Sequence, residues 1–415
     1  MTLQPPPGSS VTGAELDALL GRVRAALPDY LADLERLVNI DCGSYTPDGV
    51  DEVGRFVAGY LERVGARVER RPDPDGRLGS TVVATFEGGT GGDTRPRILL
   101  IGHMDTVFEP GTVAQRPFRV DDGIAYGPGV SDMKGGLLAG LYAIAAVRNE
   151  LGSLPFGRLT FLANPDEEIG SPSSTPHIRE VAVQADACLV LECARANGDI
   201  VSSRKGIADL RIAIHGRAAH AGVEPEKGRS AVLAGAHLVT AIHALNGLRP
   251  GVTANVGVFT AGTRPNIVPD EAHLEVDLRA IRRADLEAAV DAVRALADQP
   301  AVPDVSMTIE TMARWWPMEK LAVSERLVEH AGGLARRLGF EARDAATGGA
   351  SDANTTSGMG VPTLDGLGPI GGRDHSPDEY LEVDSIVPRT ALVAALLVAI
   401  ARDPEIHATR SGDVA

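Results

Sequence analysis

His103 and Asp105 form a His-x-Asp pair directly after the apolar run at 98–101. In an extended chain, residues two positions apart point to the same side of the backbone. The imidazole can therefore bind a metal ion while the carboxylate orients the ring from outside the ligand set. A single histidine at a strand end is common, so this pair predicts a metal site only if further ligands converge on it.

Four more residues whose side chains commonly bind metal ions follow later in the chain. Three are acids that we expect at strand ends, and one is a histidine in a glycine-rich loop: Asp132, Glu168, Glu192 and His375. Glu192 closes an apolar strand, where a carboxylate requires a partner because an isolated buried charge is costly. The others also have ordinary explanations, as a helix cap, a solvated acidic turn or a surface loop. Their shared position at segment ends nevertheless predicts one metal centre.

The charges of these side chains match two divalent metal ions. Two zinc ions carry four positive charges, which three carboxylates and one bridging hydroxide balance, while two neutral histidines complete the ligands. Two Zn²⁺ are expected, and the same nitrogen and oxygen ligands would accept Mn²⁺ or Co²⁺. Such a pair polarises a carbonyl group and acidifies a shared water. Glu167, beside Glu168, remains as the free carboxylate that can act as general base.

Short apolar strands that alternate with helices must position these residues. The runs at 98–101, 159–163 and 188–191 are typical of buried strands, and 133–147 is typical of a buried helix. This alternation predicts an α/β fold whose sheet is covered on both faces. Ligands bind at the carboxyl ends of the strands in such sheets, where the candidate residues lie.

The pattern changes after residue 204. Half-exposed strands are indicated at 208–215, 253–260 and 272–279, with helices at 230–245 and 284–297. A strand–helix–strand–strand–helix–strand order predicts a small inserted α+β domain with one open sheet face. We therefore expect an inserted domain at 205–317 and a discontinuous metal-binding domain at 14–204 and 318–415.

Composition limits the classes of partner. The 415 residues carry a formal net charge of −16, which argues against nucleic acid or an anionic membrane as partner. No apolar run approaches the roughly 20 residues that a membrane span needs. The three cysteines, Cys42, Cys188 and Cys193, do not form a disulfide framework, and the N-terminus lacks a signal-peptide pattern. A cytoplasmic location is the simplest expectation.

Four sequence blocks resemble a known enzyme family. They are GHMDTV at 102–107, GPGVSDMKGG at 127–136, DEEIG at 166–170 and HSPDEY at 375–380. In this order they resemble the di-zinc metallopeptidase and amidohydrolase family, which includes aminoacylases, acetylornithine deacetylase, succinyl-diaminopimelate desuccinylase and glutamate carboxypeptidase. The resemblance extends over about 15–403. It implies a di-zinc exopeptidase-like catalytic domain, with a central mixed sheet flanked by helices, and a ferredoxin-like lid and dimerisation domain.

The resemblance also implies a role for each candidate residue. His103 and Glu192 would bind one metal and Glu168 and His375 the other, with Asp132 bridging both. Asp105 would orient His103, and Glu167 would be the general base that passes a proton from water to the leaving nitrogen.

In the lid domain, the resemblance implies three further residues. His220 would reach the active site of the partner subunit in a homodimer and stabilise the oxyanion. Asn266 and Arg279 would hold the carboxylate of the substrate, a task that suits the fork of an arginine.

The stretches at 347–354 and 367–369 resemble the loops near the specificity pocket of bacterial glutamate carboxypeptidases. We therefore expect hydrolysis of an amide bond that releases a C-terminal amino acid, glutamate first, from a small peptide or N-acyl amino acid. The alternatives are an N-acyl-amino-acid deacylase and a catalytically inactive binding protein that keeps the dimer domain.

Overall fold

The computed structural model describes residues 11–88, 95–152 and 154–406, and within them the chain divides into two compact units. The first contains the residues up to Ser202, Lys320–Ala346 and the residues from Ser351 onward. The second contains Ser203–Glu319 and Thr347–Ala350. This division differs from the expected domain boundaries at 203–204, 318–319 and 347–350.

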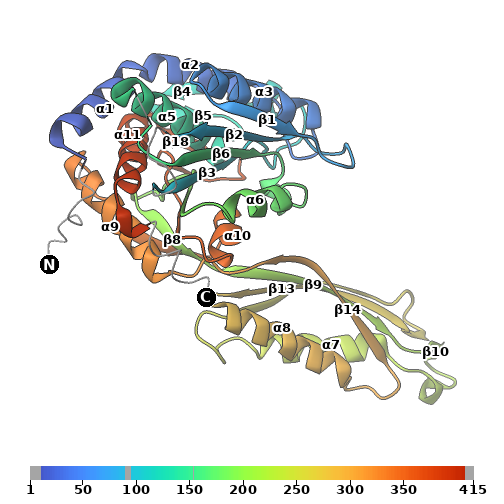
Figure 1. Ribbon diagram of the computed structural model, residues 1–415. Helices are drawn as coiled ribbons and strands as arrows, with labels where there is room; N and C mark the ends of the chain where they lie inside the picture. Colours follow the sequence, from blue (N-terminus) through green and yellow to red (C-terminus); the bar gives the residue numbers. More distant parts are fainter. Residues whose placement is uncertain (1–10, 89–94, 153, 407–415) are drawn as a thin grey trace. The chain divides into compact units, whose positions relative to one another are not determined.

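A six-stranded mixed sheet forms the centre of the first unit (Figure 1). Its strands lie in the order β1 (Arg67–Arg71), β2 (Thr81–Glu87), β6 (Arg158–Asn164), β3 (Arg97–His103), β7 (Ala187–Val190) and β16 (Thr363–Leu364). β3 runs parallel to both of its neighbours, so that Ile101 is paired with Leu162 on β6 and with Val190 on β7. The carboxyl ends of these three strands therefore meet at one edge of the sheet, as the alternation of strands and helices predicted.

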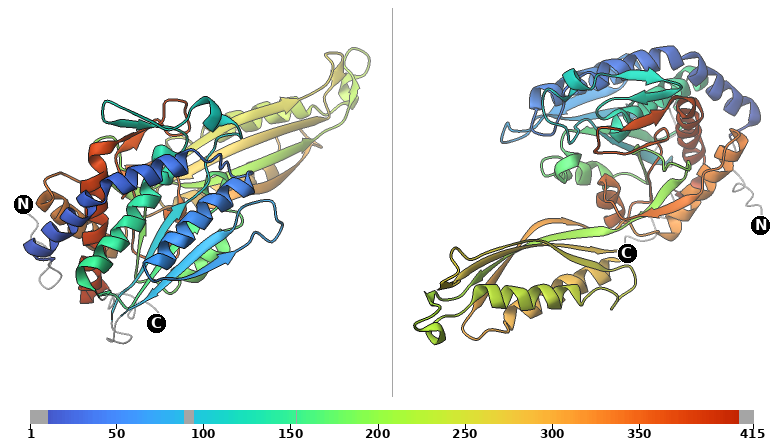
Figure 2. Two further views of the ribbon diagram at one scale, coloured as in Figure 1. Left: turned by 90° about the horizontal axis from the view of Figure 1, so that it is seen from above. Right: turned by 180° about the vertical axis from the view of Figure 1, so that it is seen from behind.

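Helices cover both faces of this sheet, which confirms the predicted α/β class. They are α1 (Gly13–Ala25), α2 (Leu27–Val38), α3 (Pro47–Arg63), α5 (Gly136–Leu151), α6 (Thr175–Ala182), α9 (Ala322–Arg337), α10 (Asp352–Gly358) and α11 (Val383–Ala401). Figure 2, viewed from above, shows α2, α3 and α5 together over one face, and α6 and α10 lie on the other side in Figure 1. The core between sheet and helices is built from Val, Leu, Ile, Ala and Phe side chains.

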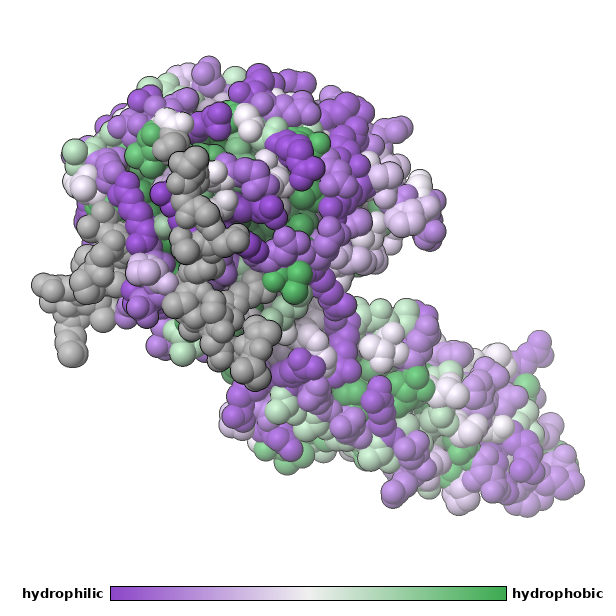
Figure 3. All heavy atoms as spheres, viewed as in Figure 1, coloured by the Kyte–Doolittle hydropathy of each residue, from purple (hydrophilic) through white to green (hydrophobic). Residues whose placement is uncertain are grey.

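Two helical stretches are longer than the apolar runs that we counted in the sequence. Val130–Leu151 and Val383–Ala401 have the length and hydropathy of a membrane span, which corrects the expectation that no segment does. In the 18-residue window that qualifies each stretch, 89% and 83% are buried inside the structure, as in core helices. Hydrophilic side chains dominate the face of the first unit seen in Figure 3.

The remaining small elements of the first unit include a four-stranded sheet that the sequence did not predict. Its order is β17 (Gly371–Gly372), β18 (Tyr380–Glu382), β5 (Ile124–Tyr126) and β4 (Arg119–Asp121). Because β18 pairs with β5, the loop at 373–379 is held beside the chain that leads to Asp132. Short helical turns are α4 (Thr112–Gln115), η2 (Val130–Gly135) and η3 (Glu167–Ile169), and β8 (Ile200–Arg204) pairs with β15 (Asp344–Thr347).

The second unit has the predicted ferredoxin-like topology. Its antiparallel sheet has the order β11 (Thr253–Ala261), β13 (Glu271–Ala280), β9 (Gly206–His215) and β14 (Ser306–Trp315). The helices α7 (Ala231–His243) and α8 (Arg283–Asp298) pack on one face, and buried and exposed residues alternate along β13 because the other face is open. A short pair, β10 (Ala219–His220) with β12 (Ile267–Val268), and the turn η4 (Pro225–Lys227) complete the unit.

Candidate metal centre

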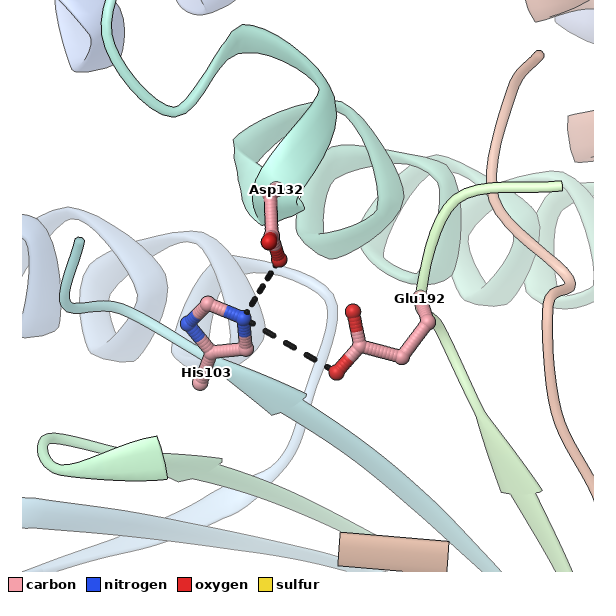
Figure 4. A group of neighbouring side chains, drawn as sticks. All are labelled: His103, Asp132 and Glu192. Carbon is pink, nitrogen blue, oxygen red and sulfur yellow. Dashed lines mark hydrogen bonds and ion pairs between the residues drawn. The ribbon is translucent and has the colours of Figure 1, made fainter. Parts of the chain in front are cut away.

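Three of the predicted ligands meet at the edge of the six-stranded sheet (Figure 4). His103 ends β3, Glu192 follows β7, and Asp132 lies on the η2 turn, not at a strand end as we expected. The Nε2 atom of His103 lies 3.0 Å from Asp132 Oδ1 and 3.8 Å from Glu192 Oε1. Their possible ligand atoms all lie within 4.8 Å of one another, which is the separation expected around one ion.

A second group shares Asp132 with the first. The Nε2 atom of His375 lies 3.1 Å from Asp132 Oδ2 and 3.0 Å from Glu168 Oε2. Each oxygen of the Asp132 carboxylate therefore faces a different histidine. The structure thus brings all five predicted ligands together in two groups with one carboxylate in common.

Glycine allows the helix that follows Asp132 to approach the strand that carries Glu192. Any Cβ at Gly136 would overlap the carbonyl oxygen of Leu191, the residue before Glu192. The start of α5 can therefore lie directly against the end of β7. Gly129, at φ 74°, provides the left-handed turn that precedes the ligand segment.

The electrostatics of the cluster indicate a need for positive charge. Burial raises the pKa of Glu168, and burial together with Glu192 raises the pKa of Glu167 well above its usual value. Hydrogen bonds with Asp132 and Glu168 raise the pKa of His375 to about 10. Several carboxylates thus compete for protons in a partly buried space, and divalent cations would relieve this repulsion. Carboxylate oxygens and imidazole nitrogens are suitable donors for such cations.

Asp105 connects His103 to the turn that carries Glu167 and Glu168. Its Oδ1 and Oδ2 atoms accept hydrogen bonds from the backbone amides of Glu167 and Glu168, each at 3.2 Å. His103 Nδ1 lies 3.3 Å from Asp105 Oδ1 and 3.0 Å from the Asp105 carbonyl oxygen. The fully buried carboxylate also accepts a hydrogen bond of 2.6 Å from the Ser44 hydroxyl. It is therefore placed to orient both a predicted ligand and the predicted base.

Sequence reasoning missed Glu379, which holds the turn that carries Asp132. The buried Glu379 carboxylate accepts hydrogen bonds from the backbone amides of Gly129, Ser131 and Asp132 at 2.8–3.0 Å. Burial raises its pKa to about 7. The only available signal was its place in the block at 375–380, where an acid among other acids looks like a solvated loop residue.

The three predicted residues of the lid lie at two separate places in the second unit. His220 and Asn266 are exposed neighbours, because β10 pairs with β12 and the Ala221 amide donates to the Asn266 carbonyl at 3.0 Å. Arg279 is paired with Ile207, near one end of strand β9. His220 follows His215, which is the last residue at the other end of β9. His215 lies eight residues after Ile207, a separation of about 26 Å along the strand. His220 and Asn266 therefore cannot meet Arg279 around one small substrate within a single second unit.

Arg279 is already bonded within its own unit. Its Nε and Nη2 atoms donate to the Asp277 carboxylate at 2.9–3.1 Å, and Nη1 donates to the Gly348 carbonyl at 2.9 Å. The guanidinium fork is thus set for a carboxylate, and a substrate carboxylate would compete with Asp277 for it.

Comparison with known proteins gives consistent matches along most of the chain. The model of Peptidase family M20/M25/M40 matches residues 99–399. Carboxypeptidase G2 of Pseudomonas sp. (strain RS-16) is 33% identical over 378 residues, which cover 89% of each chain. Acetylornithine deacetylase of Proteus mirabilis (strain HI4320) is 25% identical over 390 residues, which cover 89% of this chain and 96% of that protein.

Solved structures share the fold. Aminopeptidase PepT from Bacillus cereus ATCC 10987 has a TM-score of 0.76 at 24% identity and covers 90% of this chain and 99% of its own. The M20 family metallo-carboxypeptidase Sso-CP2 from Sulfolobus solfataricus has a TM-score of 0.72 at 16% identity, with the same coverage of both chains.

Proposed function

The chain belongs to peptidase family M20/M25/M40, a family of metal-dependent hydrolases, and from this premise we propose that it is a carboxypeptidase of the glutamate-releasing type. The bond to be cleaved is an amide whose amine side is an amino acid with a free carboxylate. The substrate is a small peptide or an N-acyl amino acid, and glutamate is the first residue to test. The similarity to carboxypeptidase G2 over 89% of the chain supports this choice.

The observation that carries the proposal is the pair of ligand groups that share Asp132. His103 and Glu192 would hold one divalent cation, Glu168 and His375 the other, and Asp132 would contact both. Zn²⁺ is the first expectation, and Mn²⁺ or Co²⁺ suit the same donors. When bound, such a pair polarises the amide carbonyl and acidifies water.

Glu167 is the proposed general base. Its backbone amide is fixed by Asp105, and burial beside Glu192 raises the pKa of its carboxyl group. A raised pKa suits a group that takes a proton from the attacking water and delivers it to the leaving nitrogen. Glu168, the next residue, is directed to His375 instead, so the two adjacent acids have different tasks.

The positions of the lid residues support a homodimer. We propose that Arg279 binds the substrate carboxylate and that His220 and Asn266 are supplied by the partner subunit. The proposal follows from the separation of Arg279 from the other two along the same sheet. It revises the expectation that Asn266 and Arg279 of one chain hold the same carboxylate.

The edge strand β11 is the proposed centre of the dimer contact. It pairs only with β13 within the described residues, and Val258 and Phe259 on it are 42% and 40% exposed. Leu233 on the neighbouring helix α7 is 51% exposed. An unpaired strand edge flanked by apolar side chains is a ready surface for a second copy of the chain.

A recess of about 320 Å³ in the first unit is a suitable place for the acyl part of the substrate. Tyr45, Leu78 and Ile169 line it, and Ile169 follows the proposed ligand Glu168 directly. A volume of this size accommodates a drug-sized group. The size of this recess supports a substrate whose acyl group is larger than acetyl.

Initial rates on metal-loaded protein test the proposal. Pteroylglutamate, short peptides ending in glutamate and a panel of N-acetyl amino acids should be compared at equal enzyme concentration, with release of the free amino acid as the readout. We expect the highest kcat/KM for a substrate that releases glutamate from a large acyl group. A clear preference for N-acetyl substrates would instead identify an N-acyl-amino-acid deacylase, the activity named for the relative from Proteus mirabilis. A cytoplasmic location remains part of the proposal, and the three free buried cysteines are consistent with it.

A further inference from the structure

We propose that Asp352 is a positioning residue that holds the turn carrying Glu167 and Glu168. This inference rests on the proposed function, because it takes Glu167 to be the base. Asp352 begins α10, which packs beside α6 in the first unit. It is not one of the predicted ligands.

The two oxygens of Asp352 contact the turn on both sides of the base. Oδ2 accepts a hydrogen bond from the Asn164 side-chain amide at the end of β6, and Oδ1 accepts one of 2.7 Å from the Ser171 hydroxyl. Glu167 and Glu168 lie between these two donors in the chain. Asp352 therefore fixes both ends of a short segment whose middle carries a proposed base and a proposed ligand.

Ser171 needs such a contact because its backbone is strained. It has φ 54°, in the left-handed region that residues other than glycine rarely adopt. Residues in this region cost free energy and persist only where surrounding contacts hold them. The Asp352 bond and the hydrogen bond from the Ser171 amide to the Asp166 carbonyl, at 2.8 Å, supply these contacts.

Burial of the Asp352 carboxylate also costs free energy that a purely structural role would not explain. The residue is 2% exposed, and the hydrogen bonds that its carboxylate accepts from Asn164 and Ser171 come from neutral side chains. A buried carboxylate without a cation is costly unless several hydrogen bonds compensate for it. The two donors that Asp352 binds, on Asn164 and Ser171, flank the base-bearing turn, and this contact is a reason to keep a carboxyl group at this position.

The segment before Asp352 contacts the proposed carboxylate-binding arginine. The carbonyl oxygens of Gly348 and Gly349, both in the second unit, accept hydrogen bonds from Arg279 and Arg204 at 2.9 and 3.1 Å. Asp352, which holds the base-bearing turn, follows Gly348 by four positions in the chain. The resemblance implied that 347–354 is a loop near the specificity pocket, and within this loop Asp352 and Asn354 are buried.

Variants of this contact test the inference on any amide substrate that the wild-type enzyme hydrolyses at saturating metal. Misplacing a base by about 1 Å costs on the order of 100-fold in rate, so D352A should lower kcat by about this factor and leave KM unchanged. S171A removes one neutral donor and should lower kcat about 2- to 10-fold. D352N keeps the shape and one acceptor, so its kcat should lie between those of D352A and the wild type.

A matched control separates positioning from stability. Asp403 is equally buried in the first unit, where Arg326 and His330 bind it away from the metal ligands. D403A should lower the Tm but leave the kcat of the folded enzyme unchanged. If D352A behaves like D403A, or if D352A fails to fold and S171A has the kcat of the wild type, Asp352 is a structural residue and the inference is wrong. If E167Q remains active, the proposed base is wrong. If E167Q is inactive but D352A has the kcat of the wild type, the base assignment stands and only the inference about Asp352 is wrong.

Discussion

The carboxylate of Asp105 accepts a hydrogen bond of 3.2 Å from the backbone amide of Glu167. The residue expected to orient a metal ligand thus also fixes the proposed base. Because the same carboxylate lies 3.3 Å from His103 Nδ1, one buried acid sets the distance between the first ligand and the base. Asp105 would thereby link metal binding to catalysis without being one of the proposed ligands.

Replacing Asp105 with asparagine should weaken both metal binding and turnover. The amide nitrogen of D105N cannot accept a hydrogen bond, so the turn keeps only one of the two hydrogen bonds that Glu167 and Glu168 donate to residue 105. Loss of a residue that orients a metal ligand typically costs about 10- to 100-fold in metal affinity or activity. Metal affinity by competition with a chelator and kcat at saturating metal measure the two effects. S44A, which removes only the hydroxyl donor to Asp105, is the control with the smaller effect.

The E167Q variant should lose turnover and keep its metals. Glutamine preserves the shape of the side chain but cannot take a proton, and general base catalysis contributes about 10²- to 10⁴-fold to a rate. Elemental analysis should still find about two metal ions per chain, because Glu167 is not one of the proposed ligands. Retained turnover would contradict the assignment of the base, and loss of the metal would place Glu167 among the ligands.

Substitution of the ligand that both groups share should remove more metal than substitution of a ligand that belongs to one group. Asp132 contacts both histidines, whereas His375 belongs to one group only. We expect D132A to lose metal from both positions and H375A to lose metal from one and to keep the one that His103 and Glu192 hold. Isothermal titration of metal-free protein with Zn²⁺ measures the number of strong sites. Equal losses in D132A and H375A would show that Asp132 does not bridge.

Much of the metal centre could be predicted because its residues follow strands. His103 ends one of two neighbouring parallel strands and Glu192 follows the other, and apolar runs mark such strands plainly in a sequence. Asp132 was recognised as a ligand but placed at a strand end, although it lies on a helical turn before α5. The error arose because the turn contains no hydrophobic periodicity.

The residues that hold the ligands could not be predicted in the same way. Glu379 binds backbone amides of a turn about 248 residues away in the chain, and Asp352 binds a small polar side chain 181 residues away. Nothing in a local pattern distinguishes such an acid from a solvated one, because its partners are set only by the tertiary fold. The separation of Asn266 from Arg279 likewise depends on strand register, which fixes distance along a sheet.

His330 should make the stability of the first unit depend on pH. Burial lowers the pKa of His330 below its usual 6.5, although Asp403 accepts a hydrogen bond from it at 2.8 Å and opposes this effect. The unfolded chain then binds the proton more readily, so the free energy of unfolding falls as the pH drops below 6.5. Thermal unfolding at pH 7.5 and pH 5.5 should show a smaller loss of Tm in H330Q than in the wild type. The histidines of the metal centre are present in both proteins, so the difference between them isolates His330, and equal losses would contradict the prediction.

Mixed dimers should show whether His220 and Asn266 act across the subunit contact. H220A and E167Q are each expected to be inactive as homodimers. In a heterodimer, however, the H220A subunit keeps its own Glu167 and receives intact His220 and Asn266 from its E167Q partner. Random pairing of two such chains in a twofold dimer gives half heterodimers with one complete site each, so co-expression should restore about 25% of wild-type activity. Co-expression of H220A with N266A is the matched control, because every site then lacks one of the two residues and activity should stay absent. Activity in that control, or none in the first mixture, would show that the two residues do not act together from the partner subunit.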